Sequence, residues 1–260
     1  MIASFGMYEL AETRAATDAL WTAIARALGL EGVAIDRERS FEDALADPSL
    51  VLGEMCGYPL THGFAGRVRV VATPCRPIAG CEEGGYRSLV VVRDAHAKLE
   101  DLRGAVVAIN DHGSHSGKHA LGALVAPLAR EGEPFFRRTL VTGSHAESLA
   151  CVARGEADVA AIDCITHALL ARHRPHAVAG TRVLAETPSA PAPPLVTRAW
   201  ATDADLAALR DALARAAADP SLAAARDALF VSSFRVLDDA AYARILDLER
   251  AHAGAAVFGP

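Results

Sequence analysis

The sequence predicts an α/β protein built from two lobes, and three observations lead to this class. Short apolar runs typical of buried strands alternate with amphipathic stretches typical of helices along most of the 260 residues. Hydrophobic residues make up 52% of the chain but aromatic residues only 5%, which suits helices packed closely on sheets. Two segments, 93–103 and 187–194, are polar or proline-rich, which is typical of crossings between compact units.

These crossings predict the domain boundaries. Residues 1–93 and 191–260 are expected to form one lobe, and residues 94–190 a second, inserted lobe, with a two-strand hinge joining them. A cleft between such lobes, at the carboxyl ends of the strands, is where small ligands bind in α/β proteins. A single doubly wound domain with a proline-rich surface loop is the alternative.

The first lobe opens with an apolar strand at 2–5 and a helix at 12–28, in which apolar residues recur at helical spacing before Gly29 offers a C-cap. The same patterns predict its remaining elements as strand 33–35, helix 41–45, strands 50–52, 68–72 and 88–92, and helices 203–217, 221–229 and 238–252. In the second lobe they predict strand 105–109, helix 116–130, strand 139–141, helix 145–154, strand 159–162, helix 164–172 and strand 182–185. This alternation favours mostly parallel sheets with helices on both faces.

The charge balance argues against some classes of partner. Asp and Glu outnumber Lys and Arg by 32 to 26, and the resulting net charge of −6 disfavours nucleic-acid binding. No apolar run reaches the roughly 18 residues of a membrane span, so no membrane insertion is expected. The first residues lack the basic and apolar regions of a signal peptide.

The strongest candidate for a ligand site is the loop after the apolar strand at 105–109, where residues 113–117 read Gly-Ser-His-Ser-Gly and open the next helix. Backbone N–H groups at a helix start, together with the helix dipole, attract an anion. Ser114 and Ser116 add hydroxyl donors beside His115, and Gly117 allows a ligand to approach the backbone. An ordinary N-cap is the alternative, and the spacing of a nucleotide P-loop is absent.

Two further strand-to-helix junctions carry polar side chains. Thr142, Ser144 and His145 follow the strand at 139–141, although Ser144 with Glu147 also matches a capping box. Asp163 follows the strand at 159–162, where it either caps the next helix or accepts hydrogen bonds from a ligand.

Two tyrosines of the first lobe also follow strands. Tyr8 comes after the opening strand, and Tyr58 comes after the strand at 50–52. Tyr58 precedes Pro59, which favours an extended backbone that projects the side chain outwards. Packing at the rim of the lobe is the alternative for both.

Neither a metal site nor a catalytic site is predicted, and no cofactor is expected. Eight of the ten histidines lie within residues 96–176, and His112, His115 and His119 are spaced three and four apart. No HExxH motif or cysteine pair supports zinc. The GxSxG motif is absent, and the spacing of Ser116, His145 and Asp163 matches no catalytic template.

The five cysteines contain no CxxC pair. They are expected to be reduced, partly buried thiols. The alternative is a bridge from Cys81 to Cys56 or Cys75, which requires an oxidising compartment.

Several stretches, in order, resemble a known family. They span residues 1–198 and read MIASFGMYE, LVLGEMCGYP, GRVRVVATP, GCEEGGYRSLVVVRD, DLRGAVVAINDHGSHSG, TGSHAESLACVARGEADVAAID and PPLVTR. The chain is similar to the phosphate/phosphonate-type substrate-binding proteins of ABC importers. Their fold is the type II periplasmic binding fold, with two Rossmann-like lobes joined by a hinge.

The resemblance implies a solute-binding protein, not an enzyme, that closes around a small anion and delivers it to an ABC permease. It implies that Ser114 and Ser116 hold an oxyanion, and that other contacts come from Tyr8, Tyr58, His145 and Asp163. A cytosolic biosynthetic enzyme or a ligand sensor on the same scaffold is the alternative. The family is exported, which implies a periplasmic protein if a leader was removed and a cytoplasmic one if the chain is complete.

Charge refines the expected ligand. Residues 94–190 hold ten Lys and Arg against eleven Asp and Glu, so no positive field recruits a dianion. Asp163 would repel bare phosphate, which favours a protonated or zwitterionic ligand, either phosphonate-like or phosphate-like. Because imidazole titrates near pH 6.5, affinity is expected to change between about pH 5.5 and 7.5 through His145.

Overall fold

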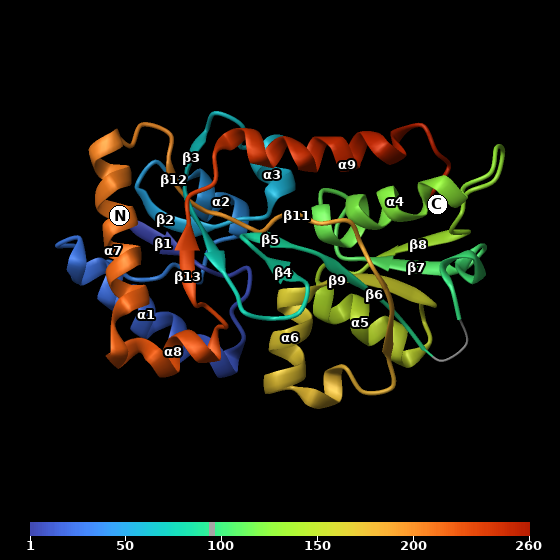
Figure 1. Ribbon diagram of the computed structural model, residues 1–260, viewed down its shortest axis with the longest axis horizontal. Helices are drawn as coiled ribbons and strands as arrows, with labels where there is room; N and C mark the ends of the chain where they lie inside the picture. Colours follow the sequence, from blue (N-terminus) through green and yellow to red (C-terminus); the bar gives the residue numbers. More distant parts are fainter. Residues whose placement is uncertain (94–96) are drawn as a thin grey trace. The chain divides into compact units, whose positions relative to one another are not determined.

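The computed structural model describes residues 1–93 and 97–260, and the chain divides into two compact units (Figure 1). Unit 1 consists of Met1–Pro77, Glu82–Gly84 and Pro191–Ala241. Unit 2 consists of Ile78–Cys81, Gly85–Ala190 and Tyr242–Pro260.

The chain passes between the units at several points. It does so within residues 77–85, inside the proline-rich segment 187–194, and between residues 241 and 242. The described residues of segment 93–103 lie within unit 2, and residues 94–96 lie outside the described part of the chain. Residues 85–93 and 242–260, which the sequence analysis placed in the first lobe, belong to unit 2.

Unit 1 is a mixed sheet with helices packed against it. Its elements are β1 (Ile2–Ser4), α1 (Arg14–Ala27), α2 (Phe41–Ala46), β2 (Leu50–Glu54), α3 (Gly57–Thr61), β3 (Val68–Cys75), β12 (Leu195–Arg198), α7 (Asp203–Ala218), α8 (Ala223–Ala228) and β13 (Ser233–Arg235). The strand order is β1-β2-β12-β3-β13, with β1 parallel to β2 and with β12 and β13 antiparallel to β3. Trp21 and Ile24 of α1 and Leu209 of α7 form the core with Val51 and Val71 of the sheet.

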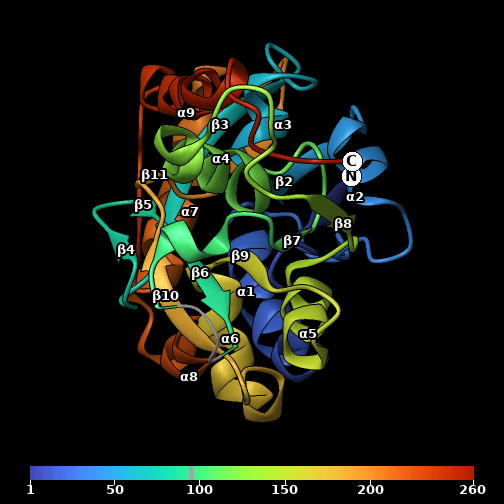
Figure 2. The same cartoon turned by 90° about the vertical axis from the view of Figure 1, so that its right-hand side faces the viewer.

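Unit 2 repeats this arrangement around a second mixed sheet. Its elements are β6 (Ser88–Val92), β7 (Val106–Ile109), the π-helical turn η3 (His115–His119), α4 (Ala120–Val125), β8 (Arg138–Val141), α5 (His145–Arg154), β9 (Val159–Asp163), α6 (Cys164–His173), β10 (Arg182–Glu186) and α9 (Ala243–Ala253). The strand order is β10-β6-β9-β7-β8. Helix α4 lies on one face of this sheet and α5 and α6 on the other, and α9 runs beside α4 (Figures 1 and 2). The short strands β4 (Cys81–Glu82), β5 (Gly85–Tyr86) and β11 (Ala190–Pro191) form a third sheet in the order β11-β5-β4.

The predicted α/β class is confirmed, whereas the prediction of mostly parallel sheets is wrong. β7 is parallel to β8 and β9, but β6 is antiparallel to both β9 and β10. The predicted strand at 33–35 contributes a single bridge between Ala3 and Ile35, and β12 and β13 were not predicted. The predicted helix at 116–130 is divided into η3, α4 and a 3₁₀ turn at Ala126–Leu128, which has Pro127 in its first turn. None of the helices within residues 1–93 and 97–260 has the length and apolar character needed to cross a membrane.

The C-terminal residues belong to unit 2 because their backbone pairs with it. The N–H groups of Phe135 and Phe136 donate to the carbonyl oxygens of Ala256 and Val257, both at 2.8 Å. Val257 is 2% exposed and packs with both phenylalanines in the core of this unit. The end of the chain therefore completes the hydrophobic core formed by β6, β7 and β9.

Replacing Val257 by alanine should lower the free energy of unfolding by about 2 kcal/mol, because it removes two buried methyl groups and leaves a cavity. Urea unfolding at neutral pH measures the change. Val236→Ala is the matched control: Val236 is 51% exposed, and its truncation should change stability by less than about 0.5 kcal/mol. An equal decrease in the free energy of unfolding in the two variants would contradict a core role for the C-terminal segment.

Candidate functional site

The loop between β7 and η3 forms a buried helix start in unit 2. Ser114 is the N-cap of η3, and its Oγ accepts a hydrogen bond from the Gly117 N–H at 3.0 Å. Ser114, His115 and Ser116 are at most 5% exposed. The N-cap role is therefore present, and the Ser114 hydroxyl still has its own proton to donate.

Gly117 leaves room for a neighbouring side chain. A Cβ at Gly117 would overlap Oδ1 of Asn110, so the close approach to this backbone is made by Asn110. Asn110 Oδ1 is buried and accepts no hydrogen bond within the described residues. Such an acceptor is normally satisfied by a ligand or a bound water. The sequence analysis missed Asn110, although an amide directly after a buried strand is a usable signal.

Ser116, His145 and Asp163 meet at the same end of the sheet. Oγ of Ser116 lies 2.8 Å from Nε2 of His145, and the same nitrogen lies 3.3 Å from Oδ2 of Asp163. They come from η3, from the first residue of α5 and from the last residue of β9. β7 pairs with both β8 and β9, so the three strand-to-helix junctions lie side by side.

This cluster does not have the geometry of a catalytic triad. In a Ser-His-Asp hydrolase the serine and the aspartate bond opposite nitrogens of the imidazole. Here Nε2 of His145 faces both Ser116 and Asp163. Oδ1 of Asp163 accepts from the N–H groups of Ile165 and Thr166 at 3.1 and 2.8 Å, so the carboxylate also caps α6. The arrangement offers hydrogen-bonding groups to a ligand without an activated nucleophile.

Burial keeps the imidazoles near this site neutral at pH 7. It lowers the pKa of His145, and the Asp163 charge and the Ala161 backbone oppose this only in part. It also lowers the pKa of His115 to about 4, with His119 and Arg244 acting in the same direction. The lowered pKa of His145 shifts the expected change in affinity towards the acidic end of the window of pH 5.5 to 7.5, and this pH dependence stays a prediction.

Thr142 and Ser144 make hydrogen bonds within their own strand-to-helix junction. The Thr142 hydroxyl lies 3.1 Å from the Ile109 carbonyl oxygen and 2.7 Å from the Ser148 hydroxyl. Ser144 is exposed, and its Oγ accepts from the Glu147 N–H at 3.1 Å as the N-cap of α5. The predicted capping box would also place the Glu147 carboxylate on the Ser144 N–H. That carboxylate pairs with Arg154 at 2.7 Å instead.

In unit 1, Tyr8 belongs to a buried charged cluster that the sequence analysis missed. The Arg76 guanidinium lies over the Tyr8 ring at 4.8 Å, and its Nη2 donates to Oε1 of Glu54 at 2.8 Å. The Arg76 and Glu54 side chains are only 4% and 7% exposed. Glu54 ends β2 and Arg76 directly follows β3. A charged residue at the end of an apolar strand was the signal in the sequence that could have indicated this buried cluster.

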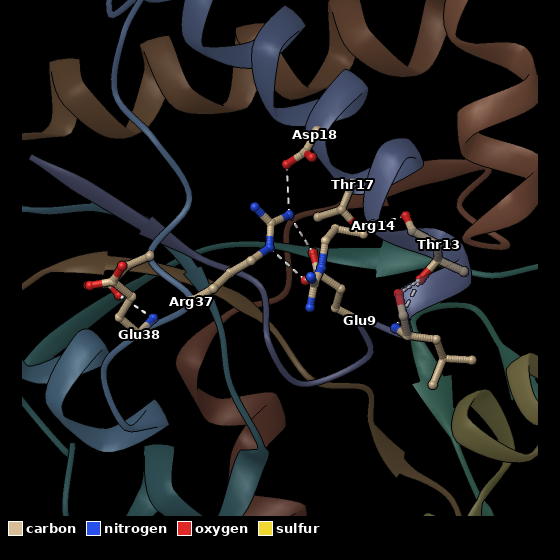
Figure 3. A network of polar contacts seen from close by, with 9 residues as sticks. Glu9, Thr13, Arg14, Thr17, Asp18, Arg37 and Glu38 are labelled. Carbon is tan, nitrogen blue, oxygen red and sulfur yellow. Dashed lines mark hydrogen bonds and ion pairs between the residues drawn. The ribbon is translucent and has the colours of Figure 1, made fainter.

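The loop that carries Tyr8 is held by an ion-pair network (Figure 3). Glu9 accepts from Arg37 at 2.7 Å and from Arg14 at 3.2 Å, and Arg37 also bonds Asp18 at 2.7 Å. The hydrogen bond to Glu9 and the one to Asp18 raise the pKa of Arg37, so its charge is permanent. Exposed pairs add little stability individually, and the effect of this network is to fix the position of the Tyr8 loop.

The backbone predicted for Tyr58 is wrong. Tyr58 lies inside α3, and its ring stacks on His62 with centroids 3.8 Å apart. The helix forms because Pro59 falls in its first turn, where a proline removes no intrahelical hydrogen bond.

The histidines that lie close together in the sequence make separate contacts in the structure. Nδ1 of His119 lies 3.0 Å from Nε2 of His252 in α9, and its Nε2 lies 3.2 Å from the His112 carbonyl oxygen. Within residues 1–93 and 97–260, no three His, Cys, Asp or Glu side chains converge as a metal site would require. His119 therefore contributes to the packing of α9.

Solved structures show that this fold is known. PhnD1 of Prochlorococcus marinus in complex with methylphosphonate has a TM-score of 0.79 at 14% identity, over 96% of this chain and 97% of that chain. A binding protein component of an ABC phosphonate transporter from Pseudomonas aeruginosa has a TM-score of 0.76 at 20% identity, over 96% and 85%. XAC2383 from Xanthomonas citri bound to ATP has a TM-score of 0.70 at 19% identity, over 97% and 96%. The fold is that of the type II periplasmic binding proteins.

The family follows from the sequence match. A search of the curated proteins found no significant match. The family model for "ABC transporter, phosphonate, periplasmic substrate-binding protein" matches residues 5–242, which include most of both units. Members of this family bind solutes and are not enzymes. The chain belongs to the phosphonate-type periplasmic substrate-binding proteins of ABC transporters.

Proposed function

We propose that this protein binds a small phosphonate, as a monoanion or as a zwitterion with an ammonium group, and delivers it to an ABC permease on the periplasmic side of the membrane. Family membership supports a small anionic solute. A protein of the same fold is known in complex with methylphosphonate. The observation that carries the proposal is the buried cluster of Ser116, His145 and Asp163 beside the start of η3.

The proposed ligand contacts are neutral donors and one carboxylate. The hydroxyl groups of Ser114 and Ser116 and the first N–H groups of the helix would bond the phosphonate oxygens. Asp163 would accept from a protonated phosphonate oxygen or from an ammonium group, since its Oδ2 faces the cluster. Asn110 Oδ1 is a second acceptor for such a donor. Two acceptors and neutral imidazoles favour a ligand that carries a proton over a bare dianion.

The remaining predicted site residues are Thr142 and Ser144 of unit 2 and Tyr8 and Tyr58 of unit 1. Thr142 and Ser144 bond within their own junction, to the Ile109 carbonyl oxygen and the Glu147 N–H, and their contact with the ligand stays a prediction. For unit 1, contact of Tyr8 and Tyr58 with the ligand stays a prediction. Tyr8→Phe and Tyr58→Phe test it, because each removes a single hydroxyl group and preserves the ring.

Thermal unfolding with added solutes tests the proposal directly. At 100 times its dissociation constant, a ligand stabilises a protein by about 2.7 kcal/mol, which raises Tm by roughly 5–10 °C in a chain of this size. We expect this shift with methylphosphonate and with an aminoalkylphosphonate, and a smaller shift with inorganic phosphate at the same concentration. ATP is included because one structural neighbour binds it.

Recovery of the ligand separates binding from turnover. Phosphorus NMR of the incubated ligand should show one unchanged species, whereas an enzyme on this scaffold would convert it. Absence of any Tm shift with both phosphonates, or a larger shift with ATP than with either, would contradict the proposal.

A further inference from the structure

Cys81 and Cys164 lie against each other in unit 2, although they are 83 positions apart in the sequence. Their Sγ atoms are 3.4 Å apart. Cys81 begins β4, and Cys164 is the first residue of α6, directly after Asp163. We propose that these two residues are a redox-sensitive modification site that closes to a Cys81–Cys164 disulfide in an oxidising environment. This inference does not depend on which solute the protein binds.

The backbones on both sides hold the two sulfur atoms in place. Gly80 has φ +88°, and a Cβ built on it would lie 2.9 Å from Cβ of Cys164, so the bare glycine allows the segment before Cys81 to pass directly over Cys164. The Cys164 N–H donates to the Arg87 carbonyl oxygen at 3.0 Å. The next residue, Ser88 at the start of β6, is the register partner of Asp163. Closure of the bond then requires the sulfurs to move from 3.4 Å to the bonding distance of about 2.05 Å.

The other cysteines lie in different surroundings. Cys151 is buried and contacts Arg154 and Glu147 of α5. Cys75 contacts the Thr73 carbonyl oxygen within β3. All five cysteines fall in the described part of the chain, where they are thiols, and Cys81 with Cys164 is the pair whose sulfur atoms touch. The contact gives Cys81 a partner, Cys164, that the sequence analysis did not consider.

The two thiols differ in exposure, which determines the order of the reaction. Cys81 is half-buried, whereas Cys164 is 1% exposed. The hydrogen bond to Cys81 and burial raise the pKa of Cys164, so its thiolate forms less readily. The accessible thiol, Cys81, is therefore the one that meets an external oxidant.

The oxidant is a disulfide, either a small molecule such as oxidised glutathione or the disulfide of an oxidoreductase, written R–S–S–R. The Cys81 thiol loses its proton and attacks one sulfur, which forms a mixed disulfide and releases R–SH. Cys164 then loses its proton and attacks Sγ of Cys81, which releases the second R–SH. In total, two protein thiols are oxidised to one disulfide while one R–S–S–R is reduced to two R–SH.

Closure should stabilise the fold. The bond joins positions 81 and 164, and a loop of this length removes much conformational freedom from the unfolded chain. We expect Tm to rise by roughly 5–10 °C on oxidation and to return on reduction with dithiothreitol. The bond also ties the start of α6 to β4.

Thiol counting and peptide mapping on the full chain test the inference. The reduced protein is equilibrated with oxidised glutathione, the remaining thiols are alkylated, and a non-reduced digest is analysed by mass spectrometry. The expected result is three alkylated cysteines, a cross-linked peptide pair containing Cys81 and Cys164, and the higher Tm. Five alkylated cysteines, a cross-link to another cysteine, or glutathione that stays on Cys81 would each overturn the inference.

Matched serine variants separate this pair from general oxidation. Cys81→Ser should abolish the Tm shift, and its half-buried position makes it the variant that tolerates substitution better than Cys164→Ser. Cys75→Ser should keep the full shift, because Cys75 takes no part in the bond. An unchanged shift in Cys81→Ser would overturn the assignment even if the wild-type Tm rises.

Discussion

Ser116→Ala should weaken the binding of methylphosphonate by about 10- to 100-fold, because a hydrogen bond to a charged group contributes about 1.5–3 kcal/mol. The Ser116 hydroxyl is buried, is 2.8 Å from Nε2 of His145, and lies in the first turn of the helix that starts at His115. Removal of the hydroxyl takes away a donor that water cannot easily replace at a 2% exposed position. Isothermal titration calorimetry at pH 7.5 measures the change.

Ser40→Ala is the control for this prediction. Ser40 is the exposed N-cap of α2 in unit 1, where its Oγ accepts from the Asp43 N–H at 3.1 Å. Its loss should lower stability by about 1 kcal/mol through the helix cap and leave affinity unchanged. Ser114→Ala removes both a helix cap and a proposed ligand donor, so it should lower both the stability of the protein and its affinity for methylphosphonate. Affinity within twofold of wild type for Ser116→Ala would exclude this hydroxyl from the site.

Acidification from pH 7 to pH 5 should lower the free energy of unfolding by about 2 kcal/mol for each of two buried histidines. Burial lowers the pKa of both His115 and His119 to about 4. The neighbouring charges of His252 and Lys118 lower the pKa of His119 further, and Glu249 opposes them. Because an unfolded histidine titrates near pH 6.5, the unfolded chain binds more protons between about pH 6.5 and 4. Stability is therefore complete above this window and is lost as the pH falls through it.

Urea unfolding at several pH values tests this prediction. His119→Gln should remove about 2 kcal/mol of the loss between pH 7 and pH 5, whatever its effect on stability at pH 7, because the proton uptake of this one imidazole is gone. His176→Gln is the control, since His176 is exposed on the surface of unit 2 and its replacement should leave the curve unchanged. A wild-type free energy that stays constant between pH 7 and 5 would contradict the buried, neutral state of these histidines.

Local signals were sufficient for most elements. The predicted helix at 145–154 coincides with α5, because Ser144 caps its start and Gly155, at φ +77°, ends it in the left-handed conformation. The apolar runs of β7 and β9 were likewise recognised within one residue at each end. The same signals failed for β13, a three-residue strand with exposed ends that forms only because β3 offers it a partner.

The site was predicted in part. The sequence identified the three junctions, because each has a polar residue directly after an apolar strand. It did not show that Ser116 meets His145 and Asp163, or that the Thr142 hydroxyl is engaged within its own junction. Those outcomes depend on β7 lying between β8 and β9. Arg76 with Glu54, in the other sheet, was missed for the same reason, since β3 and β2 meet only through β12.

By itself, the sequence determined the α/β class, the positions of the helix starts and the family resemblance. Each of these is encoded in patterns within a few residues, where hydrogen bonds and hydrophobic periodicity act locally. Only the tertiary structure decided the order of the strands, the assignment of the C-terminal residues to unit 2 and the contact of Cys81 with Cys164. These depend on pairings between distant segments, such as Thr139 with Gly259, which are 120 positions apart. Such pairings form because they bury apolar surface and satisfy backbone groups together, so no local pattern can specify them.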